Sequence, residues 1–68
     1  MKNKVDTIQI TENFFGVVIN GQRAGHIDRN ADDTDWNAHL TTSIGVELLA
    51  KRVDSPEKGT RWIAAMTI

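Results

Sequence analysis

The chain has 68 residues, of which 8 are lysine or arginine and 9 are aspartate or glutamate, so its formal net charge at pH 7 is −1. The absence of cysteine excludes a disulfide framework and a thiolate metal site. A charge so near zero also argues against a general affinity for nucleic acids, which normally requires a basic excess. A chain of this length forms one small domain, expected to span residues 1–68, and a domain this small gains stability from oligomerisation or from docking on a larger partner.

No segment of the sequence is suited to cross a membrane or to direct export. The longest apolar run, residues 14–19, includes Gly16 and is far shorter than the roughly 20 residues that span a bilayer. The amino-terminal residues 1–4 lead into a segment that Asp6 and Gln9 interrupt, unlike the apolar core of a signal peptide. We therefore expect a cytoplasmic protein without a membrane partner.

The amino-terminal half is predicted to form three antiparallel strands. Residues 4–10 contain alternating isoleucines, a pattern typical of a half-buried strand. Residues 14–19 are dense in β-branched and aromatic side chains and provide the strongest strand signal of the chain. Asn20-Gly21 follows directly, and both residues tolerate the positive φ of a type I′ turn. Residues 22–28 are therefore expected to return as the partner strand of a hairpin.

The two-residue turn also predicts how the hairpin strands pair. It places Ile19 opposite Gln22, and the same one-to-one register then continues to Phe14 opposite Ile27. The apolar side chains of the hairpin then lie on both faces, and one of these faces carries Phe15, Val17, Ile19 and Ala24. Because one helix can cover only one face of a sheet, we expect this second face to be open unless a terminal segment or a partner covers it.

The carboxy-terminal half allows two interpretations. In the first, residues 36–40 and 46–53 form the fourth and fifth strands, and a helix starts at Ser55. The order Ser55-Pro56-Glu57 provides a serine N-cap, a proline at the first helical position and an acidic residue in the first turn. The alternation Trp36-x-Ala38-x-Leu40 supports a strand in this region and favours the first interpretation.

In the second interpretation, residues 34–44 form the helix, and residues 46–53 pair with residues 60–67 as a hairpin. Gly59 favours this alternative, because a glycine inside a helix costs about 1 kcal/mol. Both interpretations predict the same class: an α+β domain with a small antiparallel β-sheet, a β-meander of about four to five strands, and one helix packed on one face. The helix is expected at the carboxy terminus.

Residues 28–35 form an acidic stretch with oxygen-bearing side chains at alternate positions. The spacing Asp28-x-Asn30-x-Asp32 matches the start of a calcium-binding loop. However, Asp33 stands where that loop needs glycine, and His39 stands where it needs a bidentate glutamate. A solvated loop is the better interpretation. A third possibility is an acidic patch for a basic partner, formed by Asp28, Asp32, Asp33 and Asp35.

His26 and His39 are the two histidines of the chain. If the third and fourth strands pair Ile27 with Ala38, the two imidazoles lie directly opposite each other, close enough to share a metal ion; another register separates them. Even the favourable register provides two ligands where a zinc site needs three or four. The nearby candidates for further ligands are Asp28 and Asp35. We therefore expect two surface histidines, with no bound metal and no cofactor.

The sequence indicates no catalytic site. Neither Ser43 nor Ser55 lies in a nucleophile-elbow motif, tyrosine and cysteine are absent, and no glycine-rich phosphate loop precedes a helix. We therefore expect a non-enzymatic protein. A small nucleic-acid-binding domain is one alternative, because basic residues lie close to Trp62 in the sequence. These basic residues are Lys51, Arg52, Lys58 and Arg61.

Protein binding is the function that these observations favour, because an open apolar patch on a small domain usually marks an interface. The residues expected at this interface are Phe15, Val17, Ile19, Ala24, His26, Asp28, Asp32, Asp33 and Asp35. Small chains without a catalytic site are typical of regulators or inhibitors that occlude a larger macromolecule, for example anti-defence proteins of phages and mobile elements. A homodimeric accessory protein is the second alternative. If this apolar face self-associates, we expect Val17→Glu to disrupt association without unfolding the chain.

Overall fold

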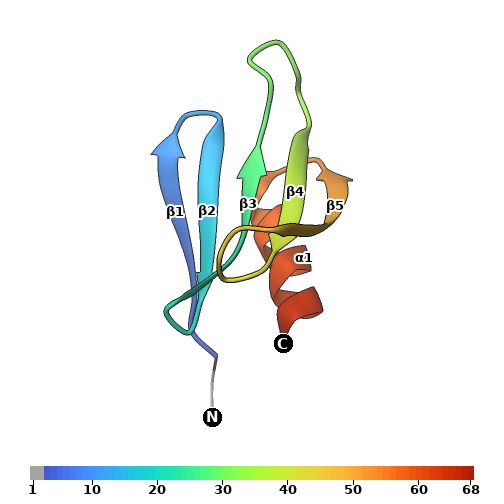
Figure 1. Ribbon diagram of the computed structural model, residues 1–68. Coiled ribbons are helices and arrows are strands. Elements are labelled where there is room, and N and C mark those ends of the chain that lie inside the picture. Colours follow the sequence, from blue (N-terminus) through green and yellow to red (C-terminus); the bar gives the residue numbers. More distant parts are fainter. Residues whose placement is uncertain (1–2) are drawn as a thin grey trace.

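The computed structural model describes residues 3–68, which form a single five-stranded sheet and a single helix (Figure 1). Residues 1 and 2, part of the amino terminus considered above for an export signal, lie outside the described residues. The sheet order β1-β2-β3-β4-β5 follows the chain, and each strand is antiparallel to its neighbours. The predicted α+β meander is confirmed. Its elements are β1 (Val5–Thr11), β2 (Phe14–Ile19), β3 (Gln22–Asp28), β4 (Trp36–Thr41), β5 (Glu47–Val53) and α1 (Pro56–Thr67).

The helix α1 lies at the carboxy terminus, as the first of the two interpretations predicts. It begins at Pro56, and the Ser55 hydroxyl accepts a hydrogen bond of 3.2 Å from the Lys58 amide, which satisfies one of the free N–H groups of the first turn. The helix has 12 residues, and no helix within residues 3–68 has the length and apolar character needed to cross a membrane.

Gly59 lies inside α1 and not in a hairpin loop, and the packing explains why a glycine is found there. A Cβ atom at this position would lie 3.0 Å from Ile27 Cδ1 and 3.4 Å from the Ala38 Cβ. The missing side chain therefore lets the helix backbone come close to β3 and β4. The helix propensity lost at Gly59 is offset by this close contact, which the sequence pattern alone does not reveal.

The β2–β3 hairpin starts as predicted and then changes register. Asn20 and Gly21 both have positive φ, at 53° and 81°, and Ile19 pairs with Gln22. A β-bulge then shifts the pairing by one residue, so that Phe14 lies opposite Asp28 and not opposite Ile27. The extra residue in β3 reverses the alternation of side chains beyond it. It brings Ala24 and Ile27, three positions apart, to the same face of the sheet.

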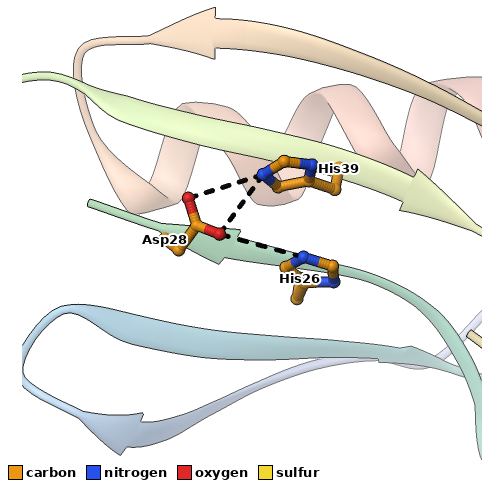
Figure 2. Close-up of side chains that lie close together, drawn as sticks. All are labelled: His26, Asp28 and His39. Atoms are coloured by element: carbon orange, nitrogen blue, oxygen red, sulfur yellow. Dashed lines mark hydrogen bonds and ion pairs between the residues drawn. The ribbon is translucent and has the colours of Figure 1, made fainter. Parts of the chain in front are cut away.

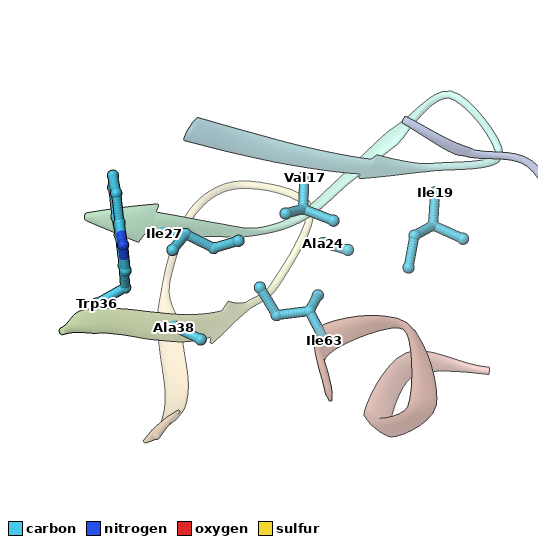
Figure 3. Close-up of a cluster of buried hydrophobic side chains, with 7 residues drawn as sticks. All are labelled: Val17, Ile19, Ala24, Ile27, Trp36, Ala38 and Ile63. Carbon is cyan, nitrogen blue, oxygen red and sulfur yellow. The ribbon is translucent and has the colours of Figure 1, made fainter. Parts of the chain in front are cut away.

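The core lies between the sheet and α1 (Figure 3). The helix contributes Ile63, whose side chain is fully buried and points towards β3 and β4. The rim of the core includes Phe15, whose ring meets Trp36 edge-on at 5.5 Å between centroids. The buried apolar residues are Val17, Ile19, Ala24, Ile27, Trp36, Ala38 and Ile63.

The expectation that the face with Phe15 and Val17 is open is therefore wrong. The helix covers this face, because the bulge in β3 adds Ile27 to it and makes it the larger apolar surface. Val17, Ile19 and Ala24 have exposed fractions of 0%, 6% and 4%, so they cannot contact a partner in the folded chain. A candidate binding surface has to be sought on the opposite face.

Candidate functional site on the open sheet face

The face of the sheet that points away from α1 is called the open face. Side chains alternate along a strand, so Gly16 and Val18 face away from the helix while Val17 faces it. On β3, the core residue Ile27 is flanked by His26 and Asp28. The open face includes Ile8, Ile10, Phe14, Gly16, Val18, Arg23, His26, Asp28 and His39.

Three aromatic rings are stacked across the middle of the open face. The Phe14 and His26 rings are 5.4 Å apart between centroids and inclined by 11°. The His26 and His39 rings are 4.4 Å apart and inclined by 17°. The last contact exists because β3 and β4 pair Ile27 with Ala38, which sets His26 directly opposite His39. This is the one of the two predicted registers that brings the histidines together.

Two carboxylates make polar contacts with the two imidazole rings. The Asp28 side chain lies beside the two stacked imidazoles, within reach of both (Figure 2), with Oδ2 3.3 Å from His39 Nε2 and 3.9 Å from His26 Nε2. On its other side, His39 Nδ1 is hydrogen-bonded to the carboxylate of Glu47. The sequence interpretation named Asp28 as a neighbour of the histidines but missed Glu47.

A second β-bulge explains why Glu47 was missed. His39 pairs with Ala50 and Leu40 with Leu49, but Thr41 then pairs with Glu47 and skips one residue. Without this irregularity, the alternation of side chains would place Glu47 on the helix side of the sheet. Neither the composition nor the periodicity of residues 46–53 contains a signal for the bulge.

The environment of His26 favours its neutral form. Burial lowers the pKa of His26 below its ordinary value, and the nearby His39 lowers it further, while Asp28 and Glu47 act in the opposite direction. At neutral pH the ring is therefore uncharged and has one nitrogen with a free electron pair. Such a nitrogen can accept a hydrogen bond or bind a metal ion.

A hollow of about 390 Å³ lies beside the stacked rings. Gly16 has no side chain to fill it, since a Cβ there would meet Ile10 Cδ1 only at 3.7 Å. The loop between β4 and β5 bends towards β3 (Figure 1) and closes one end at Gly45, beside the Arg23 guanidinium. Most of the remaining lining is apolar and comes from Ile8, Ile10, Phe14 and Val18.

The acidic stretch predicted to face a partner is divided by the structure. Asp28 lies on the open face, and Asp32 is exposed in the loop. Arg52 of β5 donates hydrogen bonds of 2.6 and 2.7 Å to Asp33 and lies 3.5 Å from Asp35. The hydrogen bond from Arg52 lowers the pKa of Asp33, which stays ionised and paired within the chain. Asp33 and Asp35 thus both pair with Arg52 within the chain, and its single positive charge offsets one of their two negative charges.

Three of the four basic residues proposed for nucleic-acid binding, Arg52, Lys58 and Arg61, pair with acidic neighbours in the same way. Besides the contacts of Arg52, Lys58 lies 3.0 Å from Asp54 and Arg61 lies 2.8 Å from Glu57. Trp62 is half-buried against the core and is not displayed as a stacking platform. A nucleic acid would have to compete with these acidic neighbours, so the structure offers little support for this alternative.

Comparisons with protein-family models, with curated protein sequences and with solved structures returned no match.

Proposed function

We propose that the chain is a non-enzymatic protein-binding domain that docks on a larger protein through the open face. The observation that carries this proposal is the hollow on that face. Its apolar lining is not covered by any segment within residues 3–68, and Ile8 and Ile10 have exposed fractions of 51% and 62%. Exposed apolar residues that are grouped around a concave surface are typical of interaction sites.

The lining of the hollow indicates what the partner presents. A space of about 390 Å³ is large enough to receive apolar side chains of the partner. Within residues 3–68, Arg23 at its edge makes no ion pair, so an acidic residue on the partner can pair with it. The partner segment is therefore apolar with a neighbouring carboxylate. This differs from the basic partner suggested by the acidic stretch, in which Asp33 and Asp35 already pair with Arg52.

The biological role we propose is that of a regulator or inhibitor. A 7.6 kDa domain seated on a larger protein blocks access to the surface beneath it, and this steric action requires no catalytic group. The small size also fits an anti-defence protein of a phage or mobile element that acts in the cytoplasm, and we include this origin in the proposal.

The partner can be identified with a cross-linker placed on either side of the molecule. A photo-reactive amino acid at position 8 lies on the open face, while one at position 66 lies on α1, and the native residues Ile8 and Met66 are equally exposed at 51%. The proposal requires a partner that is captured by the cross-linker at position 8 and not by the cross-linker at position 66. Equal capture from both positions, or capture from position 66 alone, would contradict docking through the open face.

Ile10→Lys is expected to weaken binding of that purified partner at least about tenfold, because a buried isoleucine side chain contributes about 1.5–3 kcal/mol. The matched control is Ile68→Lys, since Ile10 and Ile68 have exposed fractions of 62% and 63% and lie on different elements. The Kd of each variant is measured by isothermal titration calorimetry. An unchanged Kd for Ile10→Lys, or an equal loss in both variants, would exclude the open face as the docking surface.

Self-association is the competing outcome. Sedimentation equilibrium of the purified chain at micromolar concentration is expected to show a monomer. A dimer that Ile10→Lys dissociates and Ile68→Lys does not would mean that a second copy occupies the hollow. The chain would then be the homodimeric accessory protein considered as the second alternative.

A further inference from the structure

We propose that His26, Asp28 and His39 bind one divalent transition-metal ion of the zinc type on the open face. The function proposed above does not require such a site. The two proposals can therefore fail separately, since one is tested with a metal ion and the other with a protein partner.

The spacing of the donor atoms fits a common metal ion. One nitrogen of each histidine and one carboxylate oxygen of Asp28 lie within 4.8 Å of one another. Two ligands of a tetrahedral zinc ion are separated by about 3.4 Å, because each lies about 2.0–2.1 Å from the metal. The carboxylate oxygen is 3.3 Å from the nearer imidazole nitrogen and 3.9 Å from the other. These two separations bracket the spacing that a tetrahedral ion requires, and an ion bound there would draw the two nearly parallel imidazoles together at Asp28.

Glu47 provides an independent indication of a metal site. Its carboxylate can only accept a hydrogen bond, so His39 Nδ1 carries the proton. With Nδ1 engaged by Glu47, Nε2 is the ring nitrogen of His39 left to bind a metal ion, and it lies 3.3 Å from a carboxylate oxygen of Asp28. Metal-binding histidines usually donate their second N–H to a carboxylate in this way.

The scaffold holds these ligands in place before a metal arrives. His26 and His39 are directly paired on β3 and β4, and Asp28 follows His26 by two positions, on the same face of the strand. Phe14 stacks on the His26 ring from the other side and limits its rotation. Ligands on central strands lose little conformational freedom when they bind, which favours affinity.

The donor set also indicates the class of metal. Two imidazole nitrogens and one carboxylate oxygen suit zinc and its neighbours among the divalent transition metals, whereas calcium and magnesium prefer oxygen ligands alone. Three protein ligands leave one position of a tetrahedral ion for water.

Binding is tested with Zn²⁺ alone, by isothermal titration calorimetry on the wild-type chain and four variants. We expect one Zn²⁺ per chain, no binding to Asp28→Asn or His39→Gln, and an affinity reduced about tenfold to a hundredfold in Glu47→Gln. The matched control is Glu57→Gln, which removes the same charge at an exposed position on α1, where Glu57 pairs with Arg61. This control is expected to bind Zn²⁺ like the wild type. Circular dichroism verifies that each variant is folded. If His39→Gln does not fold, Asp28→Asn alone tests whether the ligands are required for binding.

Histidine ¹⁵N spectra provide a second readout. Zn²⁺ is expected to shift the Nε2 resonances of both histidines, and Mg²⁺ at the same concentration is expected to leave them unchanged. The rival arrangement is a doubly protonated His39 that bridges Asp28 and Glu47 without a metal. Absence of zinc binding at millimolar concentration would overturn the proposal in favour of that arrangement. Binding that Asp28→Asn and Glu57→Gln weaken equally would overturn it as well, because it would show nonspecific association with surface carboxylates.

Discussion

Gly25→Ala is expected to destabilise the domain by about 3 kcal/mol or more, at the upper end of what overpacking costs. A Cβ atom at this position would lie 2.2 Å from the backbone oxygen of His39 and 2.9 Å from Ile63 Cδ1. The backbone of β4 cannot move away without breaking its pairing with β3. A core of this size rarely supplies more than about 3–5 kcal/mol in total, so much of the variant should be unfolded at 25 °C.

The control for this substitution is Gly16→Ala on the neighbouring strand. There a Cβ would meet only Ile10 Cδ1, at an ordinary contact distance of 3.7 Å. Its free energy of unfolding is expected to change by less than about 0.5 kcal/mol, or to rise slightly, since alanine costs less backbone entropy than glycine. Urea denaturation followed by circular dichroism measures both variants. Equal stability of the two would contradict the close approach of β3, β4 and α1.

Ile63→Ala is expected to cost about 2–5 kcal/mol of stability, as large-to-small substitutions in a core do. Ile63 is fully buried and is the side chain through which α1 enters the core. Its removal leaves a cavity over β3 and β4 and weakens the attachment of the helix to the sheet. In a domain this small, the loss amounts to most of the free energy of unfolding.

The matched control is Ile68→Ala at the C-cap of the same helix, because Ile68 has an exposed fraction of 63%. Its stability is expected to stay within about 0.5 kcal/mol of the wild type. Thermal unfolding followed by tryptophan fluorescence, which reports on the buried Trp36 and on Trp62 packed against the core, distinguishes the two variants. A melting temperature of Ile63→Ala equal to that of Ile68→Ala would mean that α1 is not packed as described.

The elements of the fold could be predicted because their signals are local. Asn20-Gly21 determines a tight turn through the positive φ of both residues, and Ser55-Pro56 determines a helix start through a side-chain cap and a preset φ. Each signal depends on residues that are adjacent in sequence. For this reason the strand order and the place of the helix agree with the first of the two interpretations, while Gly59 was misleading because its role depends on tertiary contacts.

The covered face could not be predicted, because it depends on the β-bulges. A shift of one residue moves every later side chain to the other face of a sheet. The bulge in β3 makes Ala24 and Ile27 neighbours in the core, and the bulge in β5 brings Glu47 to His39. The pairing of Arg52 with Asp33 joins residues 19 positions apart and also has no local signal. The histidine pair was predictable only on the condition that Ile27 pairs with Ala38.

The measurement that tests the account most directly compares the free energies of unfolding of Val17→Glu and Val18→Glu. Val17 is fully buried beneath α1, and a carboxylate there has no partner, so this variant is expected to be unfolded. Val18 lies on the open face and pairs with Arg23, so Val18→Glu is expected to stay folded with nearly unchanged stability. A folded Val17→Glu together with an unfolded Val18→Glu would show that the helix covers the other face, and the site described on the open face would then be wrong.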